Sequence, residues 1–222
     1  MLIYCTAAIS GGHLNPAVSF ALAITKQIPP MKMVCYWGAQ ILGCTLGALF
    51  YQSIQNSNDT TNNSAGCTLP CGSAGADCKL SGLNVFGFEF CATFLLVFTV
   101  FGSAVDPKTG AGNFAPIAIG FSLFVAALSI GPFTGAGLNP ARTLGPAFAA
   151  GSECFDSDGF GNTLAYVYVL AQLIGGGFAG FVYHIFFLNR PDDGQAKASS
   201  AFQFMAVETK AVKARLDQKN SA

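Results

Sequence analysis

Charged side chains are scarce in this 222-residue sequence. Lys, Arg, Asp and Glu together supply only 10% of it, whereas soluble domains average about 25%. A soluble fold of this composition could not cover its surface with charge, so we expect lipid around most of the chain. The formal net charge is zero, which argues against nucleic acid as a partner, because nucleic-acid-binding domains are usually basic.

Residues that carry catalytic chemistry are also few. The sequence has only two His, and it contains no nucleophile–base pair, no cluster of metal ligands and no phosphate-binding loop. We therefore predict that the protein is not an enzyme and needs neither cofactor nor metal. The N-terminal stretch MLIYCTAAIS lacks the basic region of a signal peptide. It is instead interpreted as the end of a membrane helix whose beginning is missing from this chain.

What the sequence does have is long runs without charge. Residues 33–54 and 113–133 contain no charged side chain, residues 85–105 contain only Glu89, and residues 160–188 contain only His184 as a titratable group. Each run reaches the roughly 20 residues that a helix needs to cross a bilayer. Four core helices of a soluble protein are the alternative, but the chain is too short to bury them on every side.

Basic residues predict the orientation of the chain. Six of them follow the last run, from Arg190 to Lys219, whereas residues 55–82 contain only Lys79. By the positive-inside rule the tail 189–222 is predicted to be cytosolic, and the loop 55–82 to lie on the opposite side of the membrane. The sequence thus divides into a channel-like domain, residues 1–188, and a cytosolic C-terminal tail.

The predicted outer loops carry two kinds of modification site. Asn58 and Asn62 begin glycosylation sequons, although sequons this short also occur by chance. Four cysteines on the same side permit disulfide bonds in an oxidising compartment; they are Cys67, Cys71, Cys78 and Cys154. Cysteines in the apolar runs are predicted to be small core residues; they are Cys5, Cys35, Cys44 and Cys91.

Two apolar segments share a motif that usually marks a turn. HLNPAVS and GLNPART both contain Leu-Asn-Pro-Ala, and the residues that align are Asn15, Pro16 and Ala17 with Asn139, Pro140 and Ala141. Asn is a strong helix N-cap and Pro is favoured at the following position. Each motif is therefore predicted to begin a half-helix inside the membrane, over residues 16–25 and 140–149. A simple turn between spans is the alternative, and the matching second copy argues against it.

Paired half-helices have a consequence for permeation. A helix N-terminus carries roughly half a positive charge, so two of them at mid-membrane would repel cations and protons but not neutral solutes. Asn15 and Asn139 would each have an amide free to donate to a passing oxygen. Arg142 would donate to solute and exclude cations in the same way, with a snorkelling structural arginine as the alternative.

Other polar residues in these segments are predicted to be structural. We expect Glu89 to hydrogen-bond the buried non-helical backbone, and His13 to pack and form hydrogen bonds. Small residues at four-residue spacing predict close helix crossings; the pairs are Gly43 with Gly47 and Gly176 with Gly180.

The segments SGGHLNPAVS, AVDPKTGAGNFAPIAIGFS and GPFTGAGLNPARTLGPAF resemble the major intrinsic proteins, the aquaporins and aquaglyceroporins. The resemblance extends to about Leu188. It implies an all-α membrane protein, a right-handed bundle of six tilted helices and two re-entrant half-helices, assembled as a homotetramer with one pore per subunit. This chain would lack the first helix and most of the second, as either a fragment or a degenerate member whose pore cannot close.

The resemblance also assigns roles by position. Asn15 and Asn139 would be the central pore donors, and Arg142, Ala127 and Ala136 would belong to the outer selectivity filter. Two alanines imply a wide filter, whereas Thr143 and Ala147 stand where glycerol facilitators tend to carry Asp and a basic residue. Water is the predicted permeant, with glycerol, urea or ammonia as the alternative, and a non-conducting structural member of the family as another. The membrane would be the plasma membrane or an endomembrane.

Overall fold

The structure is a computed structural model that describes residues 1–54, 66–70, 80–109, 111–151 and 163–188. The described residues form helices and connecting loops and contain no strand. The α-helices are α1 (Leu2–Ser10), α2 (Pro16–Ile24), α3 (Pro30–Ile54), α4 (Gly82–Val100), α5 (Ala115–Thr134), α6 (Pro140–Ala150) and α8 (Thr163–Tyr183). Short π-helical turns extend α4 through Phe101–Val105 and α8 through His184–Leu188, and 3-10 turns occupy Pro107–Thr109 and Gly112–Phe114.

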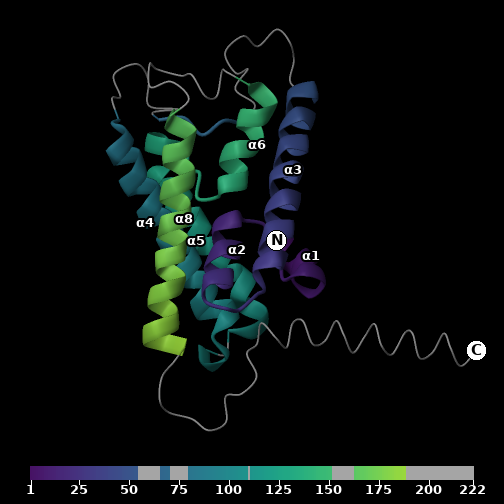
Figure 1. Cartoon of the computed structure of the whole chain (residues 1–222), viewed down its shortest axis with the longest axis vertical. Helices are drawn as coiled ribbons and strands as arrows, with labels where there is room; N and C mark the ends of the chain where they lie inside the picture. Colours follow the sequence, from purple (N-terminus) through teal and green to yellow (C-terminus); the bar gives the residue numbers. More distant parts are fainter. Residues whose placement is uncertain (55–65, 71–79, 110, 152–162, 189–222) are drawn as a thin grey trace, which may run out of the picture.

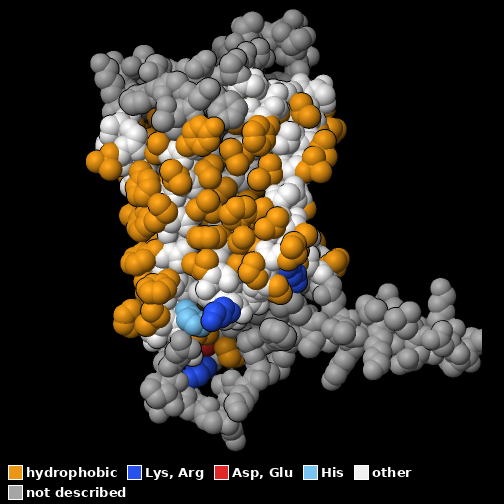
Figure 2. Space-filling model, in the orientation of Figure 1, with side chains coloured by type: hydrophobic (Ala, Val, Ile, Leu, Met, Phe, Trp, Pro, Cys, Tyr) orange, Lys and Arg blue, Asp and Glu red, His pale blue; other side chains and the backbone are white. Residues whose placement is uncertain are grey.

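Four of these helical segments are long and apolar enough to cross a membrane. They are Pro30–Ile54, Gly82–Val105, Gly112–Thr134 and Ala165–Leu188. Hydrophobic side chains cover the middle of the visible surface, and the visible basic side chains, Lys and Arg in one colour, lie toward the lower end (Figure 2). Each span begins within a few residues of the corresponding uncharged run in the sequence. The predicted number of membrane-crossing helices is therefore confirmed for the part of the chain that the structure describes.

The two Asn-Pro segments form short helices that differ from the spans. α2 has 9 residues and α6 has 11, so neither is long enough to cross a bilayer. α2 lies in the lower half of the molecule and α6 in the upper half (Figure 1). α6 packs mainly against α3, and α2 against α8. Both predicted half-helices are thus present, and each is covered by a long helix from the other part of the chain.

Small residues allow these close crossings. A Cβ added at Gly145 in α6 would lie 2.5 Å from Cβ of Cys44 in α3. Where α8 crosses α2, a Cβ at Gly176 would lie 3.2 Å from Cβ of Ala17, and one at Gly180 would lie 3.0 Å from Cβ of Ala21. The predicted crossing at Gly176 and Gly180 is therefore present.

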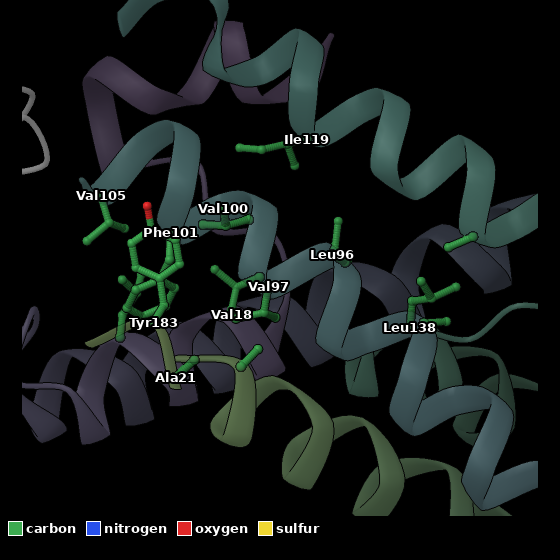
Figure 3. Packing of buried hydrophobic residues seen from close by; sticks show 14 of the residues in the cluster. Val18, Ala21, Leu96, Val97, Val100, Phe101, Val105, Ile119, Leu138 and Tyr183 are labelled. Carbon is green, nitrogen blue, oxygen red and sulfur yellow. The ribbon is translucent and has the colours of Figure 1, made fainter. Parts of the chain in front are cut away.

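Apolar side chains between α2, α4, α5 and α8 form the main buried cluster. Val97 and Phe101 are fully buried in it, beside Val18 from the half-helix and Tyr183 from the last span (Figure 3). Since α2 contributes Val18, Ala21 and Leu22 to this cluster, burial of its apolar side chains holds the short helix in the bundle. Full burial of an aliphatic side chain of this size is worth about 1.5–3 kcal/mol in water.

Two structural expectations were wrong. A Cβ at Gly43 or Gly47 would meet no atom within 4 Å, so this pair makes no close crossing among the described residues. Cys5, Cys35 and Cys91 are exposed, and none of them is a core residue. The physical reason is the same in both cases: the lipid-facing side of a membrane helix is as apolar as its packed side, so apolarity alone does not identify the buried face.

Candidate functional site

The loops that precede the two half-helices have the same backbone conformation. Asn15 has φ −154° and ψ 120°, and Asn139 has φ −154° and ψ 113°. The preceding residues, Leu14 and Leu138, have φ of 50° and 51°, a left-handed conformation that is uncommon for leucine. Three dihedral angles therefore agree closely between segments that are far apart in the chain, and the sequence repeat is also a structural repeat.

Each asparagine caps its half-helix through its side-chain oxygen. Oδ1 of Asn15 accepts from the backbone N–H of Ala17 at 2.9 Å. Oδ1 of Asn139 accepts from the backbone N–H groups of Ala141 at 3.0 Å and Arg142 at 3.4 Å. Pro16 and Pro140 follow as first helical residues, where the missing N–H of proline leaves no donor unpaired.

The side-chain amides join the two loops to each other. Nδ2 of Asn15 donates to the carbonyl oxygen of Leu138 at 2.9 Å, and Nδ2 of Asn139 donates to that of Leu14 at the same distance. We call this reciprocal pair the asparagine clasp. One N–H of each amide is used in the clasp, which the sequence did not predict. The second N–H of each amide makes no hydrogen bond with the described residues.

A cavity of about 440 Å³ reaches the clasp. Both asparagines and His13 contribute to its wall, and most of the remaining wall is apolar. Apolar side chains from α4 and α5 include Leu96, Val100, Ile119 and Leu123. Few polar side chains thus line a largely hydrophobic cavity, and both clasp asparagines are among them, an arrangement that orients a small polar molecule without binding it tightly.

Glu89 forms hydrogen bonds with the loop that precedes α6. Its carboxylate is fully buried. Oε1 accepts from the backbone N–H of Gly137 at 2.9 Å and from the Thr134 hydroxyl at 2.7 Å, and Oε2 accepts from the backbone N–H of Leu138 at 2.8 Å. The carboxylate thus pairs two backbone donors that the left-handed loop leaves outside any helix.

Gln172 completes this network, and the sequence analysis missed it. Its Nε2 donates to Oε2 of Glu89 at 2.9 Å and lies 3.1 Å from the Thr143 hydroxyl. The Tyr168 hydroxyl, one turn earlier in α8, donates to the Thr134 carbonyl oxygen at 2.7 Å. Gln172 and Tyr168 are both fully buried. A signal was available, because Gln172 is a polar side chain in the middle of an uncharged span.

Arg142 lies in the first turn of α6 and reaches a loop from elsewhere in the chain. Its Nη1 donates to the carbonyl oxygen of Gly66 at 2.5 Å. Gly66 is followed by Cys67, which is disulfide-bonded, and by Thr68, which is buried. The remaining candidate outer-loop sites, Asn58, Asn62, Cys71, Cys78 and Cys154, lie outside the described residues.

The two alanines predicted for the filter occupy different elements. Ala136 lies in the loop before α6 with φ of 50°, and its N–H donates to the Thr134 hydroxyl at 3.2 Å. Ala127 lies in α5, about two turns before its end. Both are half-buried, and neither lines the 440 Å³ cavity.

His13 packs beside the first half-helix. Its Nδ1 lies 3.1 Å from Oγ of Ser19, and the Gln40 side-chain amide donates to the same hydroxyl at 3.1 Å. The His13 ring meets the Tyr36 ring edge-on, with centroids 5.0 Å apart. Polar contacts and packing therefore account for the position of His13, while one face of it borders the cavity.

Comparison with known proteins decides the family. The family model described as "Major intrinsic protein" matches residues 1–183. This chain belongs to the major intrinsic protein family. Two relatives are Aquaporin TIP2-1 of Zea mays, 43% identical over 178 residues, and Aquaporin TIP1-1 of Arabidopsis thaliana, 39% identical over 184 residues. These alignments cover 80% and 82% of this chain, but 63% and 65% of the relatives, so the chain spans a little under two thirds of their length.

A solved structure agrees with the family assignment. The structural match is the X-ray structure of the aquaglyceroporin from Plasmodium falciparum, with a TM-score of 0.67 and 27% identity. It covers 80% of this chain and 74% of that one. The predicted aquaporin-like helical bundle is confirmed, and this member of the family is an integral membrane protein with two half-helices joined by the asparagine clasp.

Proposed function

We propose that this protein is a passive membrane channel for water. The observation that carries the proposal is the asparagine clasp, which brings the N-termini of two half-helices together beside a largely apolar cavity. The second N–H of each amide is in position to donate to the oxygen of a molecule in that cavity. Its relatives named as aquaporins support the same function, and a channel of this kind needs no catalytic residue, cofactor or metal.

Ion exclusion follows from charge. The positive ends of α2 and α6 face one another across the clasp, so a cation at this level meets two partial positive charges. Arg142 adds a full positive charge in the first turn of α6. A neutral water molecule experiences no such net repulsion, because its oxygen accepts from the same donors that repel a cation.

Small neutral solutes are the second candidate class of permeant. Ala127 and Ala136 give the proposed filter little side-chain bulk, and the structural neighbour is titled an aquaglyceroporin. We therefore propose that glycerol, urea or ammonia passes in addition to water. A non-conducting family member would need neither the second amide N–H groups nor a cavity at the clasp.

The proposal also covers the domain organisation, membrane location and assembly of the channel. Residues 1–188 would form the channel domain and residues 189–222 a cytosolic tail, in the plasma membrane or an endomembrane. The lipid bilayer surrounds the apolar band seen in Figure 2, and a homotetramer would place one pore in each subunit. Asn58 and Asn62 would accept glycans on the side opposite to the tail.

The test is stopped-flow light scattering of liposomes that contain the purified chain. An impermeant osmolyte gives the water permeability, and glycerol, urea and ammonia gradients then give the solute permeabilities in the same preparation. We expect water flux above that of protein-free vesicles and a smaller flux of at least one solute. Fluxes equal to those of protein-free vesicles for every permeant would favour the non-conducting alternative.

A further inference from the structure

The guanidinium of Arg142 is held by a segment remote from its own helix. Among the described residues its Nη1 donates to a single acceptor, the carbonyl oxygen of Gly66. A guanidinium has five N–H donors on a flexible side chain, and one acceptor is enough to select a rotamer only if that acceptor is itself fixed. The position of Arg142 therefore depends on what fixes Gly66.

Gly66 is exposed, and its backbone is left-handed, with φ of 81°. A Cβ at this position would meet nothing within 4 Å, so packing around the residue itself does not hold it. Within the part of the chain that the structure describes, the residues that follow Gly66 are the ones that restrain its carbonyl.

Two restraints follow Gly66 directly. Cys67 is disulfide-bonded. Thr68 is buried, and the segment runs against the loop before α6, where a Cβ at Gly135 would lie 3.5 Å from Cα of Thr68 and 3.4 Å from N of Leu69. The covalent restraint is the nearer of the two, one residue from the Gly66 carbonyl.

We propose that the disulfide at Cys67 positions Arg142, by fixing the Gly66 carbonyl that accepts from the guanidinium, and so sets the selectivity of the filter. The proposal rests on the proposed function, in which the positive charge of Arg142 contributes to selectivity. Reduction by a dithiol breaks the S–S bond, leaves two thiols on the protein and oxidises the reductant to its own disulfide. The Gly66 carbonyl then loses its nearest restraint, and the guanidinium samples further rotamers.

The first measurement does not require conduction. The purified chain is reconstituted, and the rate at which phenylglyoxal modifies Arg142 is followed by mass spectrometry before and after dithiothreitol, relative to free N-acetylarginine. We expect modification to become about three- to tenfold faster on reduction, consistent with loss of one charge-assisted hydrogen bond. Re-oxidation should restore the slow rate. Cys67→Ser should react at the fast rate without reductant, and Cys91→Ser, which replaces a free exposed cysteine, should behave as wild type.

Two glycine-to-alanine variants distinguish the positioning of the Gly66 carbonyl from a general effect on stability. Gly66→Ala leaves the disulfide intact but disfavours φ of 81°, so it should also raise the rate at Arg142. Gly43→Ala adds the same methyl group to a helix, where it meets nothing within 4 Å, and should leave the rate unchanged. A variant that only destabilises the fold would lower the unfolding temperature without this pattern.

The second measurement is the ratio of urea to water permeability. We expect the ratio to rise on reduction and in Cys67→Ser, because a displaced guanidinium widens the filter. An unchanged Arg142 rate on reduction overturns the inference, whether or not the protein conducts. A protein whose oxidised form does not conduct overturns the proposed function, while the labelling rates still decide whether the disulfide positions Arg142.

Discussion

Asn15 and Asn139 are each hydrogen-bonded to the residue that precedes the other, through Leu138 and Leu14 carbonyl oxygens at 2.9 Å. Both leucines have left-handed backbone, a conformation that costs of order 1 kcal/mol or more for a side chain of this kind. The left-handed turn and the clasp occur together at both sites. Each half-helix is therefore stabilised by its own cap and by the opposite loop.

A pair of substitutions at Asn139 should separate capping from clasping. Asn139→Ala removes the cap oxygen and the clasp donor, whereas Asn139→Ser retains a capping oxygen. We expect Ala to lower the free energy of unfolding by about 1 kcal/mol more than Ser, the usual value of an N-cap. Thermal unfolding in detergent measures the difference. Equal midpoints for Ala and Ser would show that the cap contributes nothing at this site.

Replacing Glu89 even with glutamine, which has nearly the same shape, should destabilise the fold. Glu89→Gln replaces one acceptor oxygen with an NH₂ group, which then faces a backbone N–H or a hydroxyl that the carboxylate accepted from. We expect a loss of about 1–3 kcal/mol, the usual cost of an unpaired buried donor, and a marked fall in water flux. Gln172→Leu removes a single donor to Glu89 and should cost less. The same unfolding assay ranks the two, and the reverse order would contradict the account of this network.

Arg142→Val removes the one full charge proposed for the filter. We expect water permeability to be retained and proton or cation permeability to rise, because part of the electrostatic barrier is lost. A pH-sensitive dye inside liposomes, or electrophysiology in a planar bilayer, detects the leak. Thr143→Ser, a change one residue further along α6 that keeps the hydroxyl beside Gln172, controls for general disturbance of the helix. If Arg142→Val shows no new leak, Arg142 is not a major barrier to ions.

The small side chains proposed for the filter lead to a prediction about the size of the solutes that pass. Ala127→His adds bulk and a polar ring, so solute permeability should fall by a larger factor than water permeability. Ala126→Ser changes a buried neighbouring position and should leave the ratio of the two unchanged. Stopped-flow measurements on both variants and wild type test this. Parallel reduction of both permeabilities by Ala127→His would mean that position 127 affects folding and not selectivity.

Local chemistry made half of the site predictable. Asn is a preferred N-cap and Pro a preferred first helical residue, so the sequence predicted α2 and α6 to within one residue at each end. Uncharged runs predicted the spans for the same reason, since length and hydrophobicity are local properties.

Contacts between distant segments were not predictable in this way. The use of one amide N–H in the clasp depends on how two loops meet, and nothing in either motif specifies the partner. The contribution of Gln172 depends on its facing Glu89 and not lipid. The open surroundings of Gly43 and the exposure of Cys91 reflect the same difficulty, because lipid-facing and packed sides of these helices share one composition.

The most direct test of the account is a paired measurement of water and proton flux in the same liposomes containing the wild-type chain. An osmotic step gives the water permeability, and a pH step with an enclosed dye gives the proton permeability. A water channel with two opposed half-helices predicts water permeability well above that of protein-free vesicles and proton permeability equal to theirs. Water permeability no higher than that of protein-free vesicles, or a proton flux that rises with it, would contradict the account.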